Sequence, residues 1–340
     1  MKNTILLLIL MPLLLGCKDS KSDSKMDRDT EEWISLFNGK DLNDWDIKIT
    51  GYGLGDNYNN TFRVEDSILR VVYDDYETFD NTFGHLYYKT PYSYYKIKLD
   101  YRFTGNQVEG GADWAKRNNG IMLHSQSATS IGLNQFFPVS IEFQLLGGLD
   151  DGNDRPTANL CTPGTYIDIK GSTIYDHCIS SNSKTYNGDQ WVHVEAVVMG
   201  SESITHIVNK DTVMVYQNLK IGEGEPNSDK VAAWKAFGVD NLDEWLSKDG
   251  KPLAEGYITL QAESGPADFK NIELLDLCGC MDEKAKNYIA PTIAVDEDAK
   301  QEIISHINGD ARRLLNFLEL LFNTAVSLKT KKIDQDFLKK

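Results

Sequence analysis

Residues 118–126 have the sequence NNGIMLHSQ, and residues 139–146 have the sequence VSIEFQLL. Apolar and polar residues alternate in both segments, which is typical of β-strands, because successive side chains of a strand point to opposite faces of the sheet. In the second segment the apolar residues fall on one face, and Glu142 and Gln144 fall on the other. If the two strands neighbour one another, His124 shares this second face with Glu142 and Gln144.

A carboxylate, an imidazole and an amide that project from one rigid sheet suit sugar binding and proton transfer. The alternative is an ordinary antiparallel strand pair with a hydrated outer face, which antiparallel sheets commonly have. The alternation by itself leaves both interpretations open.

The same kind of pattern continues from Leu36 to Leu277, where strands rich in Tyr, Val and Ile are separated by Gly, Asn and Asp. The predicted strands include 62–72, 85–89, 94–103, 191–199, 205–208, 212–216, 257–262 and 269–275. Residues 209–211 are predicted to form a hairpin turn. Helices are predicted only near 230–237 and 242–246 in this part of the chain. The layout predicts an all-β sandwich, most simply a jelly roll.

The first 17 residues resemble a lipoprotein signal peptide, because an apolar run ends in Leu-Leu-Gly-Cys. Cys17 is then expected to be lipidated and to anchor the protein to the membrane. A plain secretory signal with an incidental cysteine is the alternative. Residues 18–32 are polar and are predicted to be a flexible tether. Because Lys18 rather than an aspartate follows Cys17, we expect a bacterial cell-envelope location at the outer membrane or cell surface.

The chain has 51 acidic and 35 basic residues and a formal net charge of −16. This balance argues against nucleic acid as a partner. It is compatible with neutral substrates, or with a cation held by surplus carboxylates. Cys161 and Cys178 lie in one loop-rich stretch and are candidates for a disulfide in an oxidising compartment, and two buried free thiols are the alternative.

Several segments resemble, in order and spacing, those of one known family. They are SLFNGKDLNDW at 35–45, GHLYYK at 84–89, YRF at 101–103, WAKRNNGI at 114–121, IEFQ at 141–144, GDQW at 188–191, HIVN at 206–209, GYITLQAE at 256–263 and FKNI at 269–272. Together they resemble the 3-keto-disaccharide hydrolase domain family over roughly residues 33–277. The resemblance implies a concanavalin-like or laminarinase-like jelly roll of two antiparallel sheets, with a sugar site on the concave face.

The resemblance also implies an unusual cleavage chemistry. A ketone at C3 of the sugar acidifies the hydrogen on C2, so that a base can remove it, the glycosidic oxygen leaves from C1, and water adds to the unsaturated product. On this basis Glu142 is the expected base, and His124 the expected acid or enolate donor. Three residues depart from the usual family pattern, namely Asn119, His124 and Glu263.

Other polar residues of the matching segments are expected to bind the substrate. Gln144 and Gln261 are expected to hold sugar hydroxyls, with Lys89 and Arg117 supplying positive charge. Asn118 and Glu263 complete the predicted substrate-binding set.

No cofactor is required by this chemistry, but a divalent metal is an open alternative to the positive side chains. Its candidate ligands are Glu142, His124 and either Asp113 or Glu263. No tight ligand spacing marks such a site.

The C-terminal part has a different character. Residues 278–291 resemble the start of a cysteine-bounded tail repeat, without its closing cysteine. Residues 292–340 are predicted to be helical and resemble the lid helices of a clamp-loader-like AAA+ recombination ATPase, although the chain has no phosphate-binding loop. Two hypotheses stay open: a fusion or assembly join without a role in sugar chemistry, and a genuine helical appendage.

The sequence therefore predicts an envelope-anchored enzyme that cleaves 3-keto-glycosides or related glycosides, with a sugar 3-dehydrogenase as the expected upstream partner. The alternative is a non-catalytic carbohydrate-binding lipoprotein that uses the same face. A classical retaining glycosidase is disfavoured, because Glu142 has no second carboxylate two or four residues along its strand.

Overall fold

The computed structural model of this 340-residue chain describes residues 32–278, 294–295, 299, 332–333 and 338. The predicted signal peptide 1–17 with Cys17, tether residues 18–31 and tail residues 279–291 lie outside the described residues. So does most of the segment 292–340 that was predicted to be helical. Its described part includes β18 (Ala294–Val295), which pairs in parallel with β19 (Lys332–Ile333). No helix within the described residues is long and apolar enough to cross a bilayer.

Within residues 32–278 the chain forms two antiparallel sheets, of ten and seven strands, that pack face to face. The larger sheet has the order β11-β10-β15-β14-β13-β6-β17-β4-β3, and β1 pairs with β17. Its strands are β1 (Ile34–Ser35), β3 (Phe62–Glu65), β4 (Ile68–Val71), β6 (Tyr94–Phe103), β10 (Thr165–Ile169), β11 (Ser172–Ile174), β13 (Val192–Met199), β14 (Ser203–Val208), β15 (Asp211–Ile221) and β17 (Ala267–Asp276). Along β6 every second side chain is buried, so one face of this sheet supplies the core and the other faces outward.

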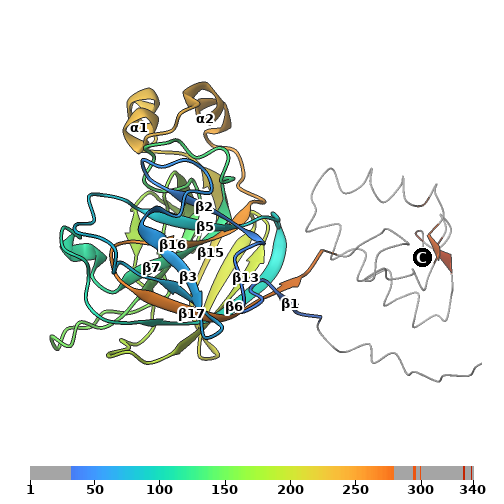
Figure 1. Ribbon diagram of the computed structural model, residues 1–340. Coiled ribbons are helices and arrows are strands. Elements are labelled where there is room, and N and C mark those ends of the chain that lie inside the picture. Colours follow the sequence, from blue (N-terminus) through green and yellow to red (C-terminus); the bar gives the residue numbers. More distant parts are fainter. Residues whose placement is uncertain (1–31, 279–293, 296–298, 300–331, 334–337, 339–340) are drawn as a thin grey trace, which may run out of the picture. The chain divides into compact units, whose positions relative to one another are not determined.

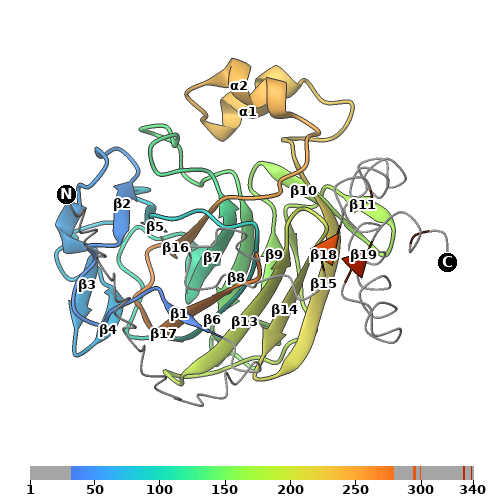
Figure 2. The same ribbon diagram turned by 90° about the vertical axis from the view of Figure 1, so that its right-hand side faces the viewer.

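The smaller sheet has the order β12-β9-β8-β7-β16-β5-β2, and Figure 2 shows β5, β16, β7, β8 and β9 side by side. Its strands are β2 (Trp45–Ile49), β5 (Gly84–Tyr88), β7 (Asn118–Ser125), β8 (Ile141–Leu146), β9 (Asn159–Cys161), β12 (Cys178–Ile179) and β16 (Tyr257–Ala262). All eight residues of β7 are buried. This sheet is therefore covered on both faces, by the core on one side and by loops on the other.

The predicted jelly-roll sandwich of two antiparallel sheets is confirmed. The strands predicted at 94–103 and 257–262 have the predicted bounds, as does helix α1 (Lys230–Phe237). Helix α2 (Leu242–Lys248) runs two residues further than predicted and lies beside α1 at one end of the sandwich (Figure 1). Asn209 and Lys210 both have positive φ, at 48° and 78°, and join β14 to β15 as the predicted hairpin turn.

The single strand predicted over 62–72 is wrong, because the chain reverses within it. Asp66 and Ser67 have φ of 53° and 61°, and the resulting two-residue turn pairs β3 with β4. Two successive left-handed residues match the twist of a tight hairpin, and polar residues such as Asp tolerate this conformation.

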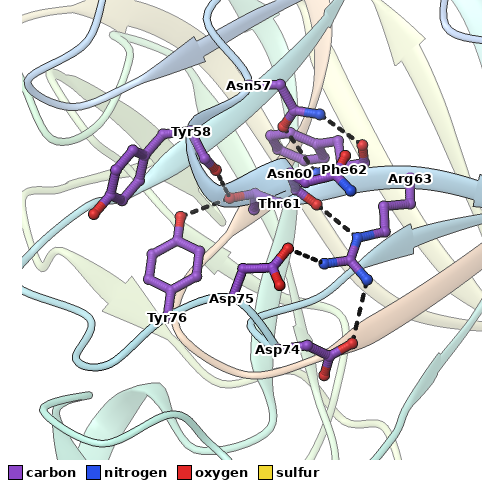
Figure 3. Close-up of polar contacts among 9 residues, drawn as sticks. All are labelled: Asn57, Tyr58, Asn60, Thr61, Phe62, Arg63, Asp74, Asp75 and Tyr76. Atoms are coloured by element: carbon purple, nitrogen blue, oxygen red, sulfur yellow. Dashed lines mark hydrogen bonds and ion pairs between the residues drawn. The ribbon is translucent and has the colours of Figure 1, made fainter.

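Polar contacts hold this hairpin to the chain segment that leads toward β5 (Figure 3). Arg63 forms ion pairs with Asp74 and Asp75, at 3.3 and 2.9 Å. The hydroxyl groups of Thr61 and Tyr76 lie 2.6 Å apart in a buried contact. The exposed ion pairs of Arg63 each contribute at most about 1 kcal/mol. The buried contact between the hydroxyl groups of Thr61 and Tyr76 is better protected from water than these ion pairs.

Candidate functional site

Strand register brings the polar residues of the smaller sheet together on its loop-covered face. Gln144 of β8 lies opposite Gly120 of β7 and opposite Asn159 of β9. On the other side of β7, Leu260 of β16 pairs with Ile121, which places Gln261 next to Gly120. Because Gly120 has no side chain, the residues on either side extend into the space above it.

The space above Gly120 is filled by a carboxylate and an amide. A Cβ atom at Gly120 would lie 2.7 Å from Oε1 of Glu142 and 3.0 Å from Oε1 of Gln261. The first distance is shorter than real Cβ contacts and the second is tighter than most of them, so a glycine here lets Glu142 and Gln261 approach one another. The prediction that Glu142 and Gln144 share a face is confirmed, since both line one pocket.

That pocket has a volume of about 390 Å³ and lies over β7, β8 and β9. Its lining residues are Trp114, Asn118, Phe137, Glu142, Gln144, Cys161, Pro163, His177, Cys178 and Glu263. Cys161 and Cys178 form the predicted disulfide, which joins β9 to β12 and makes one wall. His177 directly precedes Cys178, so it lies at this wall and lines the pocket.

Two buried carboxyl groups from separate strands share the pocket. Glu142 is 6% exposed and Glu263, which directly follows β16, is 2% exposed. Burial raises the pKa of Glu142 to about 8. Burial and the nearby charge of Glu142 raise the pKa of Glu263 well above its usual range. Among the described residues no lysine or arginine lines the pocket, so the pair holds at least one proton at neutral pH.

The same face carries an unusual concentration of buried polar atoms that have no protein partner. Within the described residues they include Asn118 Oδ1, both amide atoms of Gln261, Glu263 Oε2, His85 Nε2 and Thr259 Oγ1. Gln261 and His85 are direct cross-strand neighbours on β16 and β5. Buried polar groups are nearly always hydrogen-bonded, and two of these residues, Asn118 and Glu263, also line the pocket, where their unpaired oxygen atoms can contact a ligand.

Gln144 has a fixed orientation within this face. Its Oε1 accepts a hydrogen bond from Nδ2 of Asn159, at 3.0 Å, and Oδ1 of Asn159 accepts one from the backbone N–H of Ser181, at 2.9 Å. The amide nitrogen of Gln144 is therefore the part of this side chain that is available to a ligand.

The predicted position of His124 on this face is wrong. The pairing of β16 with β7 changes register opposite this residue, and His124 has a φ of 50°. This bulge directs the ring toward the inter-sheet core, where it lies 5.8 Å from the ring of Tyr95. Its two ring nitrogens face the carbonyl oxygens of Leu253 and Ser93, at 3.3 and 3.2 Å, and burial lowers its pKa to about 4. His124 is thus a buried neutral residue, separate from Glu142.

The predicted sources of positive charge also lie elsewhere. Lys89 is exposed and pairs with Asp46 at 3.6 Å. Arg117 pairs with Asp189 at 3.2 Å and lies over the ring of Phe103. Neither side chain is among the described residues that line the pocket, so neither supplies positive charge to it.

Of the predicted metal ligands, only Glu142 and Glu263 are brought together. Asp113 has a 95% exposed side chain and pairs with Lys116 at 2.7 Å, and His124 faces the core. No cluster of three or more His, Cys, Asp or Glu suited to a metal occurs among the described residues. The combination of Glu142, His124 and Asp113 is therefore wrong as a single coordination site.

Two features of the pocket go beyond what was predicted. Glu263 lines the pocket, as a predicted substrate-binding residue should, but its pairing with Glu142 as a second carboxyl group was missed, because the argument against a carboxylate partner considered only the strand of Glu142. His177 was also missed. Its one sequence signal is its position next to Cys178, and that signal becomes informative only when Cys161 is known to lie opposite Glu142.

A family model described as "3-keto-alpha-glucoside-1,2-lyase-like domain" matches residues 32–275. No curated protein matches the chain. The resemblance of residues 292–340 to ATPase lid helices gains no support, since the family match ends before them.

Among solved structures, a presumed glycosyl hydrolase from Parabacteroides distasonis ATCC 8503 is 20% identical, with 73% of this chain and 95% of that chain covered and a TM-score of 0.40. A second structure of that description from the same organism is 18% identical, with 72% and 100% covered and a TM-score of 0.41. The Ca²⁺-bound exoplasmic/lumenal domain of VIP36 is 10% identical, with 76% and 93% covered and a TM-score of 0.40.

Proposed function

The chain belongs to the 3-keto-alpha-glucoside-1,2-lyase-like family, and we propose that its pocket cleaves 3-keto-glycosides by C2 proton abstraction, elimination and hydration. The observation that carries the proposal is the buried pair of Glu142 and Glu263, which share a pocket without a lysine or arginine in its lining. Such a pair can hold one proton and accept another near neutral pH.

Glu142 is the base of this scheme. Because burial raises its pKa to about 8, its ionised form is a stronger base than an exposed carboxylate, while a fraction of the molecules is still ionised at neutral pH. It removes the proton from C2, and the electron pair of the C2–H bond passes into an enolate with the C3 carbonyl. When the carbonyl re-forms, a C1–C2 double bond forms, and the C1–O bond breaks with its electron pair on the leaving oxygen.

Glu263 and His177 take the roles that the sequence had given to His124. Glu263 is the more deeply buried carboxyl and stays protonated, so it can donate a hydrogen bond to the C3 oxygen and stabilise the enolate. His177 lines the pocket on the exposed side, where its neutral imidazole can donate a hydrogen bond to the leaving oxygen while that oxygen takes its proton from solvent. Asn118 and Gln144, which line the pocket, hold the sugar hydroxyls, whereas Gln261 is fully buried and lies outside the lining. Water then adds its hydroxyl to C1 and its proton to C2, which yields the free 3-keto sugar.

The two carboxyl groups also favour a second candidate, the conventional hydrolysis of an unoxidised glycoside by an acid and a nucleophile. That mechanism needs one carboxylate that stays ionised in a polar environment. In this pocket burial raises the pKa of both groups, which suits proton transfer better than nucleophilic attack.

The test compares 3-keto-glucosides with their unoxidised parents on the purified protein, by following release of the aglycone. We expect release from the keto form alone, and at least a hundredfold loss of kcat in Glu142→Gln and Glu263→Gln, since a general acid or base contributes about 10²–10⁴-fold. Asp113→Asn is the matched control, because that carboxylate is exposed and lies outside the pocket lining. Release from the parent glycoside alone would favour the conventional mechanism, and binding without any release would favour a carbohydrate-binding protein.

We also propose that Cys17 anchors the protein to the cell envelope and that a sugar 3-dehydrogenase supplies the keto substrate. Labelling of growing cells with a fatty-acid analogue should mark the wild-type protein and not Cys17→Ser. An unlabelled wild-type protein would contradict the anchor.

A further inference from the structure

The pocket lining combines two kinds of side chain. Glu142, Glu263, Asn118 and Gln144 supply polar groups that suit a sugar ring. The remaining lining residues, apart from His177, are apolar: Trp114, Phe137, Pro163 and the disulfide between Cys161 and Cys178. A ligand that fills the pocket therefore meets both polar groups and apolar surfaces.

Trp114 and two phenylalanines form what we call the aromatic rim, defined as Trp114, Phe136 and Phe137 packed on Phe83. The rings of Trp114 and Phe83 are nearly parallel, at 10°, with centroids 6.2 Å apart. Phe83 also contacts the rings of Phe136 and Phe137, at 5.3 and 4.9 Å. Trp114 is 54% exposed and Phe136 is 43% exposed, although both rest on a buried ring. Exposed aromatic rings grouped beside a pocket indicate a binding surface.

The charges of the pocket limit which leaving groups can bind at the aromatic rim. The pocket lining contains two acidic residues and no lysine or arginine, so an anionic leaving group would be left without a counter-charge. Burial also lowers the pKa of His177, which leaves this imidazole neutral at neutral pH. Trp114, Phe136 and Phe137 offer a leaving group aromatic faces rather than the several hydrogen-bonding partners that a second sugar would need.

We propose that the aromatic rim is the leaving-group subsite and that the substrates are 3-keto-glycosides of neutral aromatic alcohols. This inference rests on the proposed function, since it assigns the group that leaves from C1. The aromatic aglycone stacks on the exposed face of Trp114 while its sugar lies over Glu142 and Glu263. A phenol also leaves more readily than an alkyl alcohol, which suits a pocket whose acid groups are uncharged at neutral pH.

The experiment measures binding and turnover separately. Binding of phenyl and methyl glucosides, in both anomers, and of a glucose disaccharide is measured by calorimetry, which needs no chemical step. We expect the phenyl glucoside to bind about tenfold more tightly than the methyl glucoside or the disaccharide, the factor that one aromatic stacking contact provides. Trp114→Ala should remove this advantage and leave the affinity for methyl glucoside unchanged, and Trp114→Phe should restore most of it.

Val215→Ala is the matched control, because Val215 is also an exposed apolar residue, at 43%, but lies on β15 of the other sheet. Equal affinities for the phenyl and methyl glucosides, tighter binding of the disaccharide, no binding of the phenyl glucosides, or an unchanged preference in Trp114→Ala would each overturn the inference. If the binding preference appears but no 3-keto-glucoside is cleaved, the aromatic subsite stands and the proposed chemistry fails.

Discussion

Replacing Glu142 with glutamine is predicted to stabilise the protein at alkaline pH while abolishing turnover. In the folded protein, burial raises the pKa of Glu142 from 4.5 to about 8. Between these two values the folded state keeps a proton that the unfolded state releases. The contribution of this group to stability is therefore full below pH 4.5, is lost progressively as the pH rises to about 8, and stays constant above it.

The size of this effect follows from the pKa difference. At about 1.4 kcal/mol for each pKa unit, raising the pH from 4 to 9 costs the wild-type protein about 5 kcal/mol through Glu142. Glutamine has nearly the same shape and cannot ionise. Glu142→Gln should therefore match the wild type near pH 4 and exceed its free energy of unfolding by a few kcal/mol at pH 9. It also removes the charge that helps to raise the pKa of Glu263, so the double variant with Glu263→Gln should have the smallest pH dependence.

The assay is urea unfolding, followed by tryptophan fluorescence, at several pH values between 4 and 9. Glu244→Gln is the control of opposite sign. Glu244 is exposed, and its hydrogen bond with Lys248 lowers its pKa. Replacing this carboxylate should therefore slightly lower the free energy of unfolding at high pH. If the free energy of unfolding of Glu142→Gln falls between pH 4 and pH 9 as steeply as that of the wild type, the carboxyl group is not desolvated and the reasoning fails.

Three further predictions concern single features of the pocket and its surroundings. Gly120→Ala should abolish sugar binding, because its Cβ would lie 2.7 Å from a carboxylate oxygen, whereas Gly53→Ala, with no atom within 4 Å, should bind normally in the same calorimetric titration. The double substitution of Cys161 and Cys178 by serine should lower the free energy of unfolding by about 3 kcal/mol, as expected for a loop of this length, and should also reduce kcat/KM; unchanged kinetics would mean that the disulfide does not shape the pocket. His124→Gln should reduce stability by about 1–3 kcal/mol, because the neutral ring donates one buried hydrogen bond to the carbonyl oxygen of Leu253 or Ser93. Its kcat should stay within about threefold of wild type, and a hundredfold loss of kcat would restore the catalytic role first expected for it.

Local alternation predicted the sandwich because it is a property of the strand itself. Residues 141–145 and 95–103 alternate so that one face of each strand is apolar, and this face must be buried in any folded form. The same argument placed Glu142 and Gln144 together on the other face. The turn at Asn209 and Lys210 was also predictable, since such turns depend on two neighbouring residues.

The position of His124 could not be predicted from alternation. The bulge that turns it inward depends on the strand that β7 pairs with and on the close approach of Gly256, where a Cβ would lie 2.4 Å from the carbonyl carbon of His124. The pairing of Cys161 with Cys178 was likewise one of two open alternatives, until the register of β9 and β12 placed them opposite one another.

By itself, the sequence determined the fold class, the family and the polar face of β8, because each depends on the order of residues along a strand or on motifs within single segments. The tertiary structure alone decided which groups share the pocket. Glu142 meets Glu263 because the sheet order sets β8, β7 and β16 side by side, and His177 joins them because a disulfide closes the neighbouring wall. The raised pKa values of the two carboxyl groups come from burial at that junction, and burial is a property of the assembled sheets rather than of any one strand.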